Sequence, residues 1–323
     1  MPVPGGAKPP DASIHQHESD LVSEVLSFLA PRLDGIVIDA TAGAGRHSLA
    51  MLEASSNVTV VAYDRDPIAV ETAKSRLFKF GSSRARVRLA NFNNLAEEYA
   101  KEKLDPPSAI LLDLGLSDMQ IHDPNRGFSF MRMGPLSMKM GPDAVHSADE
   151  YVAHLSEKEL ADLIHEYGED NEARRIARRI VEARERGGIG TTTQLADVIA
   201  GPNWKGFGPH RIHPATKTFQ ALRIRVNGEM DALESVLPQA ISLLRPGGRL
   251  AVISFHSLED RPVKQYLATE SKSCLCPPDF PVCRCGHRMI LHILTKKPVT
   301  ASEDEIRRNP SARSAKMRVA EKL

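Results

Sequence analysis

The chain contains 323 residues, of which 41% are hydrophobic and 26% are charged. These proportions exclude a disordered or fibrous chain, and the length suits about two domains or one domain with an insertion. Lys and Arg number 42 and Asp and Glu number 41. The overall charge therefore gives no indication of a nucleic-acid partner, and any basic surface must be local.

No apolar run approaches the roughly 18 residues that a membrane-spanning helix needs. Residues 1–20 hold one Lys, no Arg and four Pro, a composition that fits neither a secretory signal nor an Arg-rich transit peptide. All four Cys lie between positions 274 and 285, so no disulfide framework spans the chain. We therefore expect a soluble cytoplasmic protein without a membrane partner.

Strand-like runs alternate with helical patterns along much of the chain. The runs that are apolar throughout lie at 35–39, 58–63, 109–113 and 249–255, with a weaker one at 87–89. Helical spacing of apolar residues appears between them, for example at 68–78. Continuous apolar strands joined by helices predict a doubly wound α/β fold, in which helices cover both faces of a mostly parallel sheet.

The alternation stops between residues 121 and 212. This segment contains helical patterns and no convincing strand, and we expect helices at 147–155, 157–167, 171–186 and 191–200. The core pattern returns with one long helix from about Thr216 to Leu244. The sequence thus predicts an all-helical domain at 121–212, inserted between two parts of the α/β core at 1–120 and 213–323.

Three predicted strands end in an acid, at Asp39, Asp64 and Asp113, and doubly wound sheets bind ligands at this edge. Asp64 follows Gly45 by 19 residues. A carboxylate at this spacing from a glycine turn accepts hydrogen bonds from the ribose hydroxyls of an adenosine cofactor. A tight turn in a core and a nicotinamide- or flavin-binding site remain alternatives to this interpretation.

The glycine turn reads Gly43-Ala-Gly45-Arg46-His47-Ser, so it lacks the third glycine of a dinucleotide fingerprint. A pyrophosphate needs the close helix approach that this glycine allows, whereas S-adenosylmethionine has no phosphate to bind. The turn therefore favours a methyl donor over a nicotinamide cofactor.

The segment after the fourth strand carries two candidate catalytic residues, Asp113 and Ser117. An exocyclic amine on a base is a poor nucleophile because its lone pair is delocalised into the ring. Oxygen acceptors that bind its N–H groups favour a pyramidal nitrogen whose lone pair can attack a methyl group in line. Asp113 and Ser117 are suited to this task, and capping of a turn is the alternative role for Asp113.

Several motifs together resemble the MraW-type family, the ribosomal RNA small-subunit methyltransferases H. The resemblance runs from about His17 to the C-terminus. It rests on LLDLGLSDMQIHDPNRGFSF (111–130), GPLSMKM (134–140), HPATKTFQALRIRVN (213–227), PGGRLAVISFHSLEDRPVK (246–264) and NPSARSAKMRVAEK (309–322).

The resemblance implies a Rossmann-like class I methyltransferase that uses S-adenosylmethionine to methylate N4 of a cytosine in the decoding region of 16S ribosomal RNA. Its expected partner is that RNA or a partly assembled small subunit. The oligomeric state stays open, with a homodimer as one alternative. The cofactor-binding positions that the resemblance implies are Gly45, Arg46, His47, Asp64, Phe92, Asp113 and Gln120.

Three positions depart from the family pattern. Ala40 and Arg46 replace glycines of the turn, and Asp118 replaces a second Ser. If position 46 requires a positive φ, a non-glycine residue there weakens cofactor binding. These departures leave open a second interpretation, in which the protein is a catalytically weakened RNA-binding factor for ribosome assembly.

Two segments are locally basic. The predicted helix at 171–186 has six Arg and three Glu, with Arg174, Arg175, Arg178 and Arg179 opposite an apolar face. The C-terminal segment 307–323 has four Arg, two Lys and one Glu, and we expect a basic tail there. Both could contact a phosphate backbone, as could His213, Thr216, Lys217, Gln220 and Arg223, although a solvated helix face is the simpler explanation.

Cys274, Cys276, Cys283 and Cys285 form two Cys-x-Cys pairs separated by six residues. Four thiolates can bind a structural Zn²⁺ tetrahedrally, although zinc ligand pairs are usually spaced by two to four residues. Reduced free thiols are the alternative.

Overall fold

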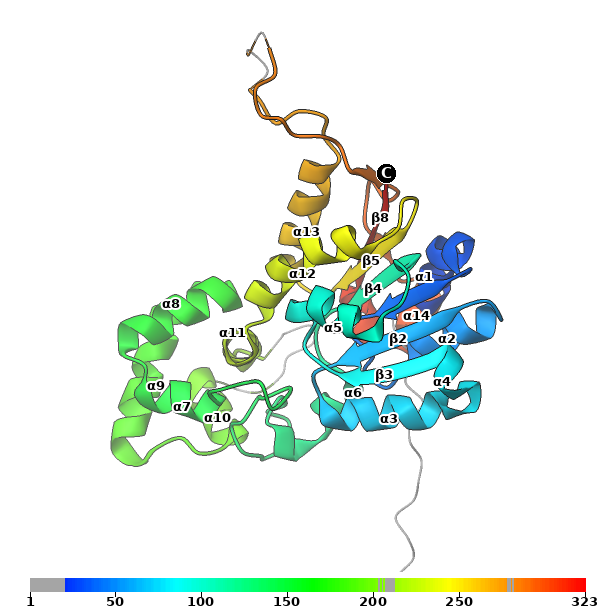
Figure 1. The fold of residues 1–323 in the computed structure, drawn as a ribbon. Coiled ribbons are helices and arrows are strands. Elements are labelled where there is room, and N and C mark those ends of the chain that lie inside the picture. The colour runs from blue at the N-terminus through cyan, green and yellow to red at the C-terminus, as the bar shows by residue number, and fades with distance from the viewer. Residues whose placement is uncertain (1–20, 203, 205, 207–212, 278–279, 281) are drawn as a thin grey trace, which may run out of the picture.

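A computed structural model describes residues 21–202, 204, 206, 213–277, 280 and 282–323. A central sheet lies beside a group of helices, and a narrow arm extends from one end of the molecule (Figure 1). None of the helices in the described ranges has the length and apolar character of a membrane span.

The strands of the sheet lie in the order β3-β2-β1-β4-β5-β8-β6, and β7 also pairs with β8. The first five strands are parallel to one another. They are β1 (Ile36–Asp39), β2 (Thr59–Asp64), β3 (Ala85–Leu89), β4 (Ala109–Asp113) and β5 (Arg249–Ser254). The strand order reverses between β1 and β4, which is the place where doubly wound sheets bind ligands. The predicted doubly wound α/β fold is confirmed.

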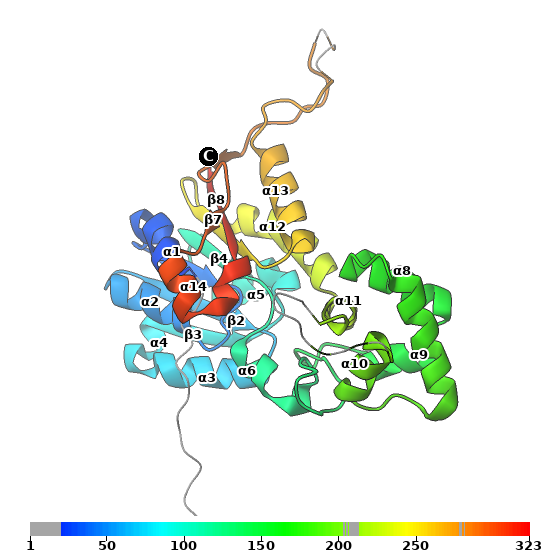
Figure 2. The same cartoon turned by 180° about the vertical axis from the view of Figure 1, so that it is seen from behind.

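Helices cover both faces of the sheet (Figures 1 and 2). One face packs against α1 (Val22–Leu29), α2 (Arg46–Ala54) and α3 (Pro67–Leu77), and the other packs against α5 (Leu95–Glu102), α12 (Glu229–Leu243) and α13 (Ser257–Glu270). Neighbouring strand residues such as Val60 and Val61 point to opposite faces and belong to different cores. The inner strands β1, β2, β4 and β5 are therefore mainly apolar because both of their faces are buried, whereas the edge strand β3 carries Arg86 and Arg88.

The four helices expected between β4 and β5 are present as α7 (Ala148–His154), α8 (Glu157–Gly168), α9 (Ala173–Gly187) and α10 (Thr192–Ala200). Thr191 caps α10 in a capping box with Gln194. Among the described residues between β4 and β5, no strand forms beyond an isolated bridge of Pro135 with Thr191. These helices share a hydrophobic core separate from the two cores of the sheet.

The expected long helix from Thr216 to Leu244 is wrong as a single element. Gly228 adopts a φ of +58° and separates α11 (Ala215–Asn227) from α12. Residues of α11, such as Phe219 and Leu222, belong to the core of the helical group. The proposed domain boundary at 212 thus separates α11 in sequence from the helices it packs against.

The expected basic tail at the C-terminus is also wrong. Residues Lys316–Lys322 form β8, which lies between β5 and β6 (Leu291–Ile293) and pairs antiparallel with β5, β6 and β7 (Val299–Thr300). Arg318 is 8% exposed and donates to both carboxylate oxygens of Asp260, at 2.6 and 2.9 Å. Burial of Met317 and Val319 in the sheet core explains why this segment is ordered.

Three short helices complete the architecture. They are α4 (Gly81–Arg84), α6 (Asp118–His122) and α14 (Glu303–Arg308). Leu21 at the start of α1 donates its backbone N–H to Glu305 of α14 at 2.6 Å. The first and last helices of the described chain are therefore in direct contact.

Candidate active site

The carboxyl edge of the parallel strands holds a cavity of about 350 Å³. Its wall is formed by the segments that follow the five parallel strands, together with side chains of α11 and α12. Cavities that bind small ligands typically measure about 300–1,000 Å³. The site residues expected from the sequence that line this cavity are Arg46, His47, Asp64, Phe92, Asp113, Ser117 and Gln120.

Two glycines shape the turn between β1 and α2. Gly43 and Gly45 adopt φ values of +50° and +75°, which only glycine adopts readily. A Cβ on Gly45 would lie 3.1 Å from the Cβ of Ala73 in α3. Gly45 therefore lets α2 approach α3, and it is not part of the cavity wall. Arg46 is the first residue of α2 and has no positive φ, so its side chain does not strain the turn.

Asp64 ends β2 and faces the glycine turn. Its two carboxylate oxygens accept hydrogen bonds from the backbone N–H groups of Gly43, at 2.7 Å, and Asp66, at 2.8 Å. Burial raises the pKa of Asp64 to about 6, although these two hydrogen bonds lower it. Each carboxylate oxygen has a second lone pair, so Asp64 can still accept hydrogen bonds from a ligand.

Asp113 ends β4 and lies across the turn from Asp64. Its Oδ2 is 3.3 Å from Nε2 of His47. Its Oδ1 is buried and has no hydrogen-bond partner among the described residues. A buried acceptor without a donor costs about 1–3 kcal/mol. Asp113 Oδ1 therefore marks a position at which a ligand can donate a hydrogen bond.

Asp39, the third strand-terminal acid, has a different environment. It is fully buried and accepts hydrogen bonds from the Ser48 hydroxyl at 2.6 Å and from the backbone N–H of Thr41 at 3.3 Å. Burial raises the pKa of Asp39. It is not part of the cavity wall, and it fixes the start of α2 to the end of β1.

The loop after β4 enters α6 through a capping box. The Ser117 hydroxyl accepts from the backbone N–H of Gln120 at 3.4 Å, and Gln120 Oε1 accepts from the backbone N–H of Ser117 at 3.0 Å. Gln120 Nε2 donates to Asp66 Oδ2 at 3.0 Å. Gln120 thus orients the loop through both of its polar atoms, whereas the Ser117 hydroxyl keeps a free lone pair.

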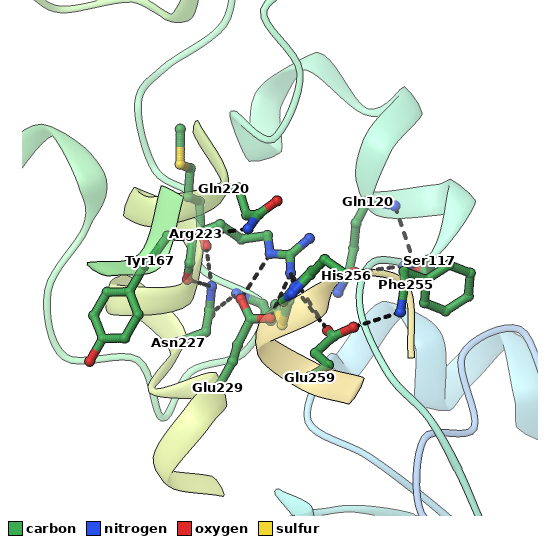
Figure 3. Close-up of polar contacts among 12 residues, drawn as sticks. Ser117, Gln120, Tyr167, Gln220, Arg223, Asn227, Glu229, Phe255, His256 and Glu259 are labelled. Atoms are coloured by element: carbon green, nitrogen blue, oxygen red, sulfur yellow. Dashed lines mark hydrogen bonds and ion pairs between the residues drawn. The ribbon is translucent and has the colours of Figure 1, made fainter. Parts of the chain in front are cut away.

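A buried ionic network closes the other side of the cavity (Figure 3). Arg223 of α11 donates from Nε and Nη2 to the two carboxylate oxygens of Glu229, each at 2.9 Å. Nε2 of His256 lies 3.3 Å from Arg223 Nη2 and 3.2 Å from Glu259 Oε1. Glu259 also accepts from the backbone N–H of Phe255 at 2.7 Å. The network joins α11, α12 and the start of α13.

Burial raises the pKa of Glu259, but the hydrogen bond and charge of His256 and the charge of Arg223 outweigh this effect and hold the pKa below its usual value. Glu259 is therefore ionised at neutral pH. Glu259 thus places an ionised carboxylate in the wall of the cavity.

The sequence matches the MraW methylase family over residues 14–323. The chain belongs to this family. A Thermomicrobium roseum protein named ribosomal RNA small subunit methyltransferase H is 50% identical over 308 residues, which cover 95% of this chain and 94% of that protein. Proteins of the same name from Geobacter sulfurreducens and Heliobacterium modesticaldum are 47% and 43% identical, cover 95% and 96% of this chain, and are themselves covered over 99% of their length.

Membership of the MraW methylase family, together with the sheet order, identifies the core as a Rossmann-like class I methyltransferase fold. The resemblance seen in the sequence motifs is therefore confirmed. Membership of a methylase family favours a methyl donor over the alternative of a nicotinamide-dependent oxidoreductase, to which a nicotinamide-binding turn would belong.

Two acidic residues of this site were missed by the sequence analysis. Glu229 and Glu259 are 8% and 1% exposed, and both line the cavity. Among the described residues, α12 and α13 otherwise contribute only Met230 and Leu233 to the cavity wall. The roles of the two acids depend on the position of Arg223. The only available signal was the position of Glu259 in the motif that follows the fifth strand.

A second cavity lies between the helical group and the start of α13. His213, Thr216, Lys217 and Gln220 line it, whereas Arg223 lines the first cavity. Two of these residues are held by backbone carbonyls of α8 and its C-cap, because Lys217 donates to Glu169 and Gln220 donates to Tyr167. His256 belongs to the wall of this cavity, so the ionic network separates the two cavities.

Proposed function

We propose that the protein transfers a methyl group from S-adenosylmethionine to N4 of a cytosine in the decoding region of small-subunit ribosomal RNA. Its membership of a methylase family and the names of its relatives support methyl transfer to this RNA. The observation that carries the proposal is the pair Asp64 and Asp113 in the wall of one cavity. The Asp64 carboxylate suits the ribose of the cofactor, and the Asp113 carboxylate suits the amine of the cytosine.

The residues around the glycine turn fit S-adenosylmethionine. Asp64 accepts hydrogen bonds from the two ribose hydroxyls, and the ring of Phe92 offers an apolar surface to the adenine. The amides of Arg46 and His47 at the start of α2 are further contacts. When bound, this cofactor supplies a methyl group on a positively charged sulfur, and the Glu259 carboxylate in the cavity wall favours that charge.

Asp113 and Ser117 bind the cytosine amine. Asp113 Oδ1 has no donor within the described part of the chain, so it accepts one N–H of the amine, while the Ser117 hydroxyl accepts the other. These hydrogen bonds turn the nitrogen lone pair out of the ring and toward the methyl group. Asp113 Oδ1 then accepts the proton that the nitrogen loses, a role suited to a carboxylate with unused acceptor capacity.

The inserted helical domain at 121–212 is the proposed RNA-binding part of the protein. Arg174, Arg175 and Arg178 are exposed on one face of α9. Cations on such a face attract a phosphate backbone. The target base must leave its stack to reach the cavity, so a folded RNA or a partly assembled subunit in the cytoplasm is the substrate we expect.

The test uses small subunits from cells that lack this gene. The purified protein and tritiated S-adenosylmethionine are added, and the RNA is digested to nucleosides for mass spectrometry. We expect one labelled product, N4-methylcytidine, and no label with Asp64→Ala. Glu53→Gln is the matched control, because Glu53 forms only an exposed ion pair with Lys79, and it should behave as the unmodified protein.

Other outcomes contradict the proposal in distinct ways. A label on carbon 5 of cytosine or on another base refutes the N4 chemistry. RNA binding without any label identifies the catalytically weakened assembly factor, for which Arg46 and Asp118 are the motivation. The relaxed turn at Arg46 argues against this second function.

A further inference from the structure

An arm joins α13 to β6 (Figures 1 and 2). The four cysteines belong to this segment and lie close together. The Sγ atom of Cys274 is 3.3 Å from that of Cys283 and 3.8 Å from that of Cys285, and the last two are 3.5 Å apart. With Cys276 included, all four sulfur atoms lie within 4.8 Å of one another. Residues that are up to 11 positions apart in sequence thus converge on one point.

These distances match a tetrahedral metal site. A Zn–S bond of about 2.3 Å places the sulfur atoms of a tetrahedron about 3.8 Å apart. Disulfides pair each sulfur with a single partner at about 2.05 Å, whereas Cys274 lies close to both Cys283 and Cys285. The arrangement is therefore that of ligands around one ion.

Backbone N–H groups point at three of the sulfur atoms. Leu275 donates to Cys285, Cys276 donates to Cys274, and Arg284 donates to Cys276, each at 3.4 Å. Donors of this kind stabilise thiolates and orient them toward a metal. His287 lies outside the ligand set, because its Nε2 is 3.2 Å from the backbone carbonyl oxygen of Thr269.

The arm has no hydrophobic core that would hold this shape. All of its described residues between 272 and 290 are exposed or half-buried, and Leu275, Phe280 and Val282 are 44%, 49% and 67% exposed. A segment that buries so little apolar surface cannot offset the entropy of ordering its chain. A bound metal supplies the missing stabilisation in small domains of this kind.

We propose that Cys274, Cys276, Cys283 and Cys285 bind a structural Zn²⁺. Binding converts four thiols to thiolates and releases up to four protons to solvent, with no change of oxidation state. The arm begins at the far end of α13, a helix of 14 residues that spans about 20 Å from the cavity side. The metal therefore holds the arm and takes no part in methyl transfer.

The test measures metal and thiol content of the full-length protein after purification without chelator. We expect about one zinc per chain by mass spectrometry of the metal, and about four thiols that react only after chelation. The quadruple Cys→Ser variant should hold no zinc and should be cut by trypsin at Arg284 and Arg288, while its affinity for S-adenosylmethionine stays unchanged. Ser273→Ala is the control on the same arm and should keep its zinc.

Titration of the metal-free protein with Co²⁺ gives a second measurement that does not depend on a variant. Tetrahedral thiolate ligation produces intense visible absorption bands, and we expect them to saturate at about one Co²⁺ per chain and to disappear on addition of Zn²⁺. Absence of zinc with four freely reactive thiols overturns the proposal, and so does the loss of all thiols to disulfides. Neither result bears on the methyl transfer proposed above.

Discussion

Removal of the Arg223 guanidinium is the perturbation whose effect follows most directly from the structure. The side chains of Arg223 and Glu229 are 13% and 10% exposed, and the guanidinium forms two hydrogen bonds with the carboxylate. Arg223→Met leaves the buried carboxylates of Glu229 and Glu259 without their cation. Breaking a buried ion pair in this way costs about 3–5 kcal/mol. Because His256 and the backbone N–H of Phe255 still bind Glu259, we expect a loss near 3 kcal/mol.

The assay is urea unfolding followed by far-ultraviolet circular dichroism, with a slope that stays unchanged between variants. The double variant Arg223→Met/Glu229→Met replaces both partners of the main ion pair by apolar side chains. Its loss of unfolding free energy should be about 2 kcal/mol smaller than the sum of the losses in the two single variants. Arg175→Met is the control, because Arg175 and Glu172 form a surface pair with side chains 63% and 52% exposed, and it should change stability by less than about 1 kcal/mol. An Arg223→Met variant within 1 kcal/mol of the unmodified protein, or simple additivity in the double variant, refutes the reasoning.

Three further predictions concern the turn, the cofactor acid and the C-terminal strand. Gly45→Ala places an alanine at a positive φ, with its Cβ 3.1 Å from the Cβ of Ala73. We expect the free energy of unfolding to fall by about 1–3 kcal/mol. An unchanged urea midpoint would show that the turn adapts to the added methyl group. Burial raises the pKa of Asp64 to about 6, so protonation below that pH removes a hydrogen-bond acceptor. Calorimetry should therefore show weaker S-adenosylmethionine binding at pH 5 than at pH 7.5. Equal affinities at the two pH values would contradict the role of Asp64 in binding the ribose. The hydrogen bond and charge of Arg318 lower the pKa of Asp260, so this ion pair stabilises the fold above about pH 4 and less as the pH falls further. Arg318→Met should therefore lower the free energy of unfolding more at pH 7 than at pH 3. A loss of stability that does not depend on pH would contradict the assigned ion pair.

Four of the five parallel strands could be predicted clearly because burial on both faces makes them apolar, whereas β3 at the edge of the sheet carries Arg86 and Arg88 and gave only a weak signal. The last strand could not, because Lys316, Arg318 and Lys322 give its segment the composition of a basic tail. The charge of Arg318 is accommodated by Asp260, which lies 58 residues away in sequence. Contacts of that kind leave no local pattern. The break between α11 and α12 did have a local signal, since an Asn-Gly pair commonly ends a helix.

The site was predictable to the extent that its residues lie at strand ends. Asp64 and Asp113 could be found because parallel strands bring their carboxyl ends to one edge. Gly45 was expected to contact the cofactor, and the structure places it against α3. The roles of Glu229 and Glu259 could not be predicted, because they depend on how three helices are arranged around Arg223 (Figure 3). Long-range convergence of this kind cannot be derived from spacing alone.

The proposed reaction requires Asp113 Oδ1 to bind the amine that receives the methyl group. The most direct test is the single-turnover rate of methyl transfer by Asp113→Ala at saturating S-adenosylmethionine and saturating small subunits. We expect the rate to fall by about 10²-fold or more, the loss typical for a group that orients and deprotonates a nucleophile. A rate within threefold of the unmodified protein would contradict the claim.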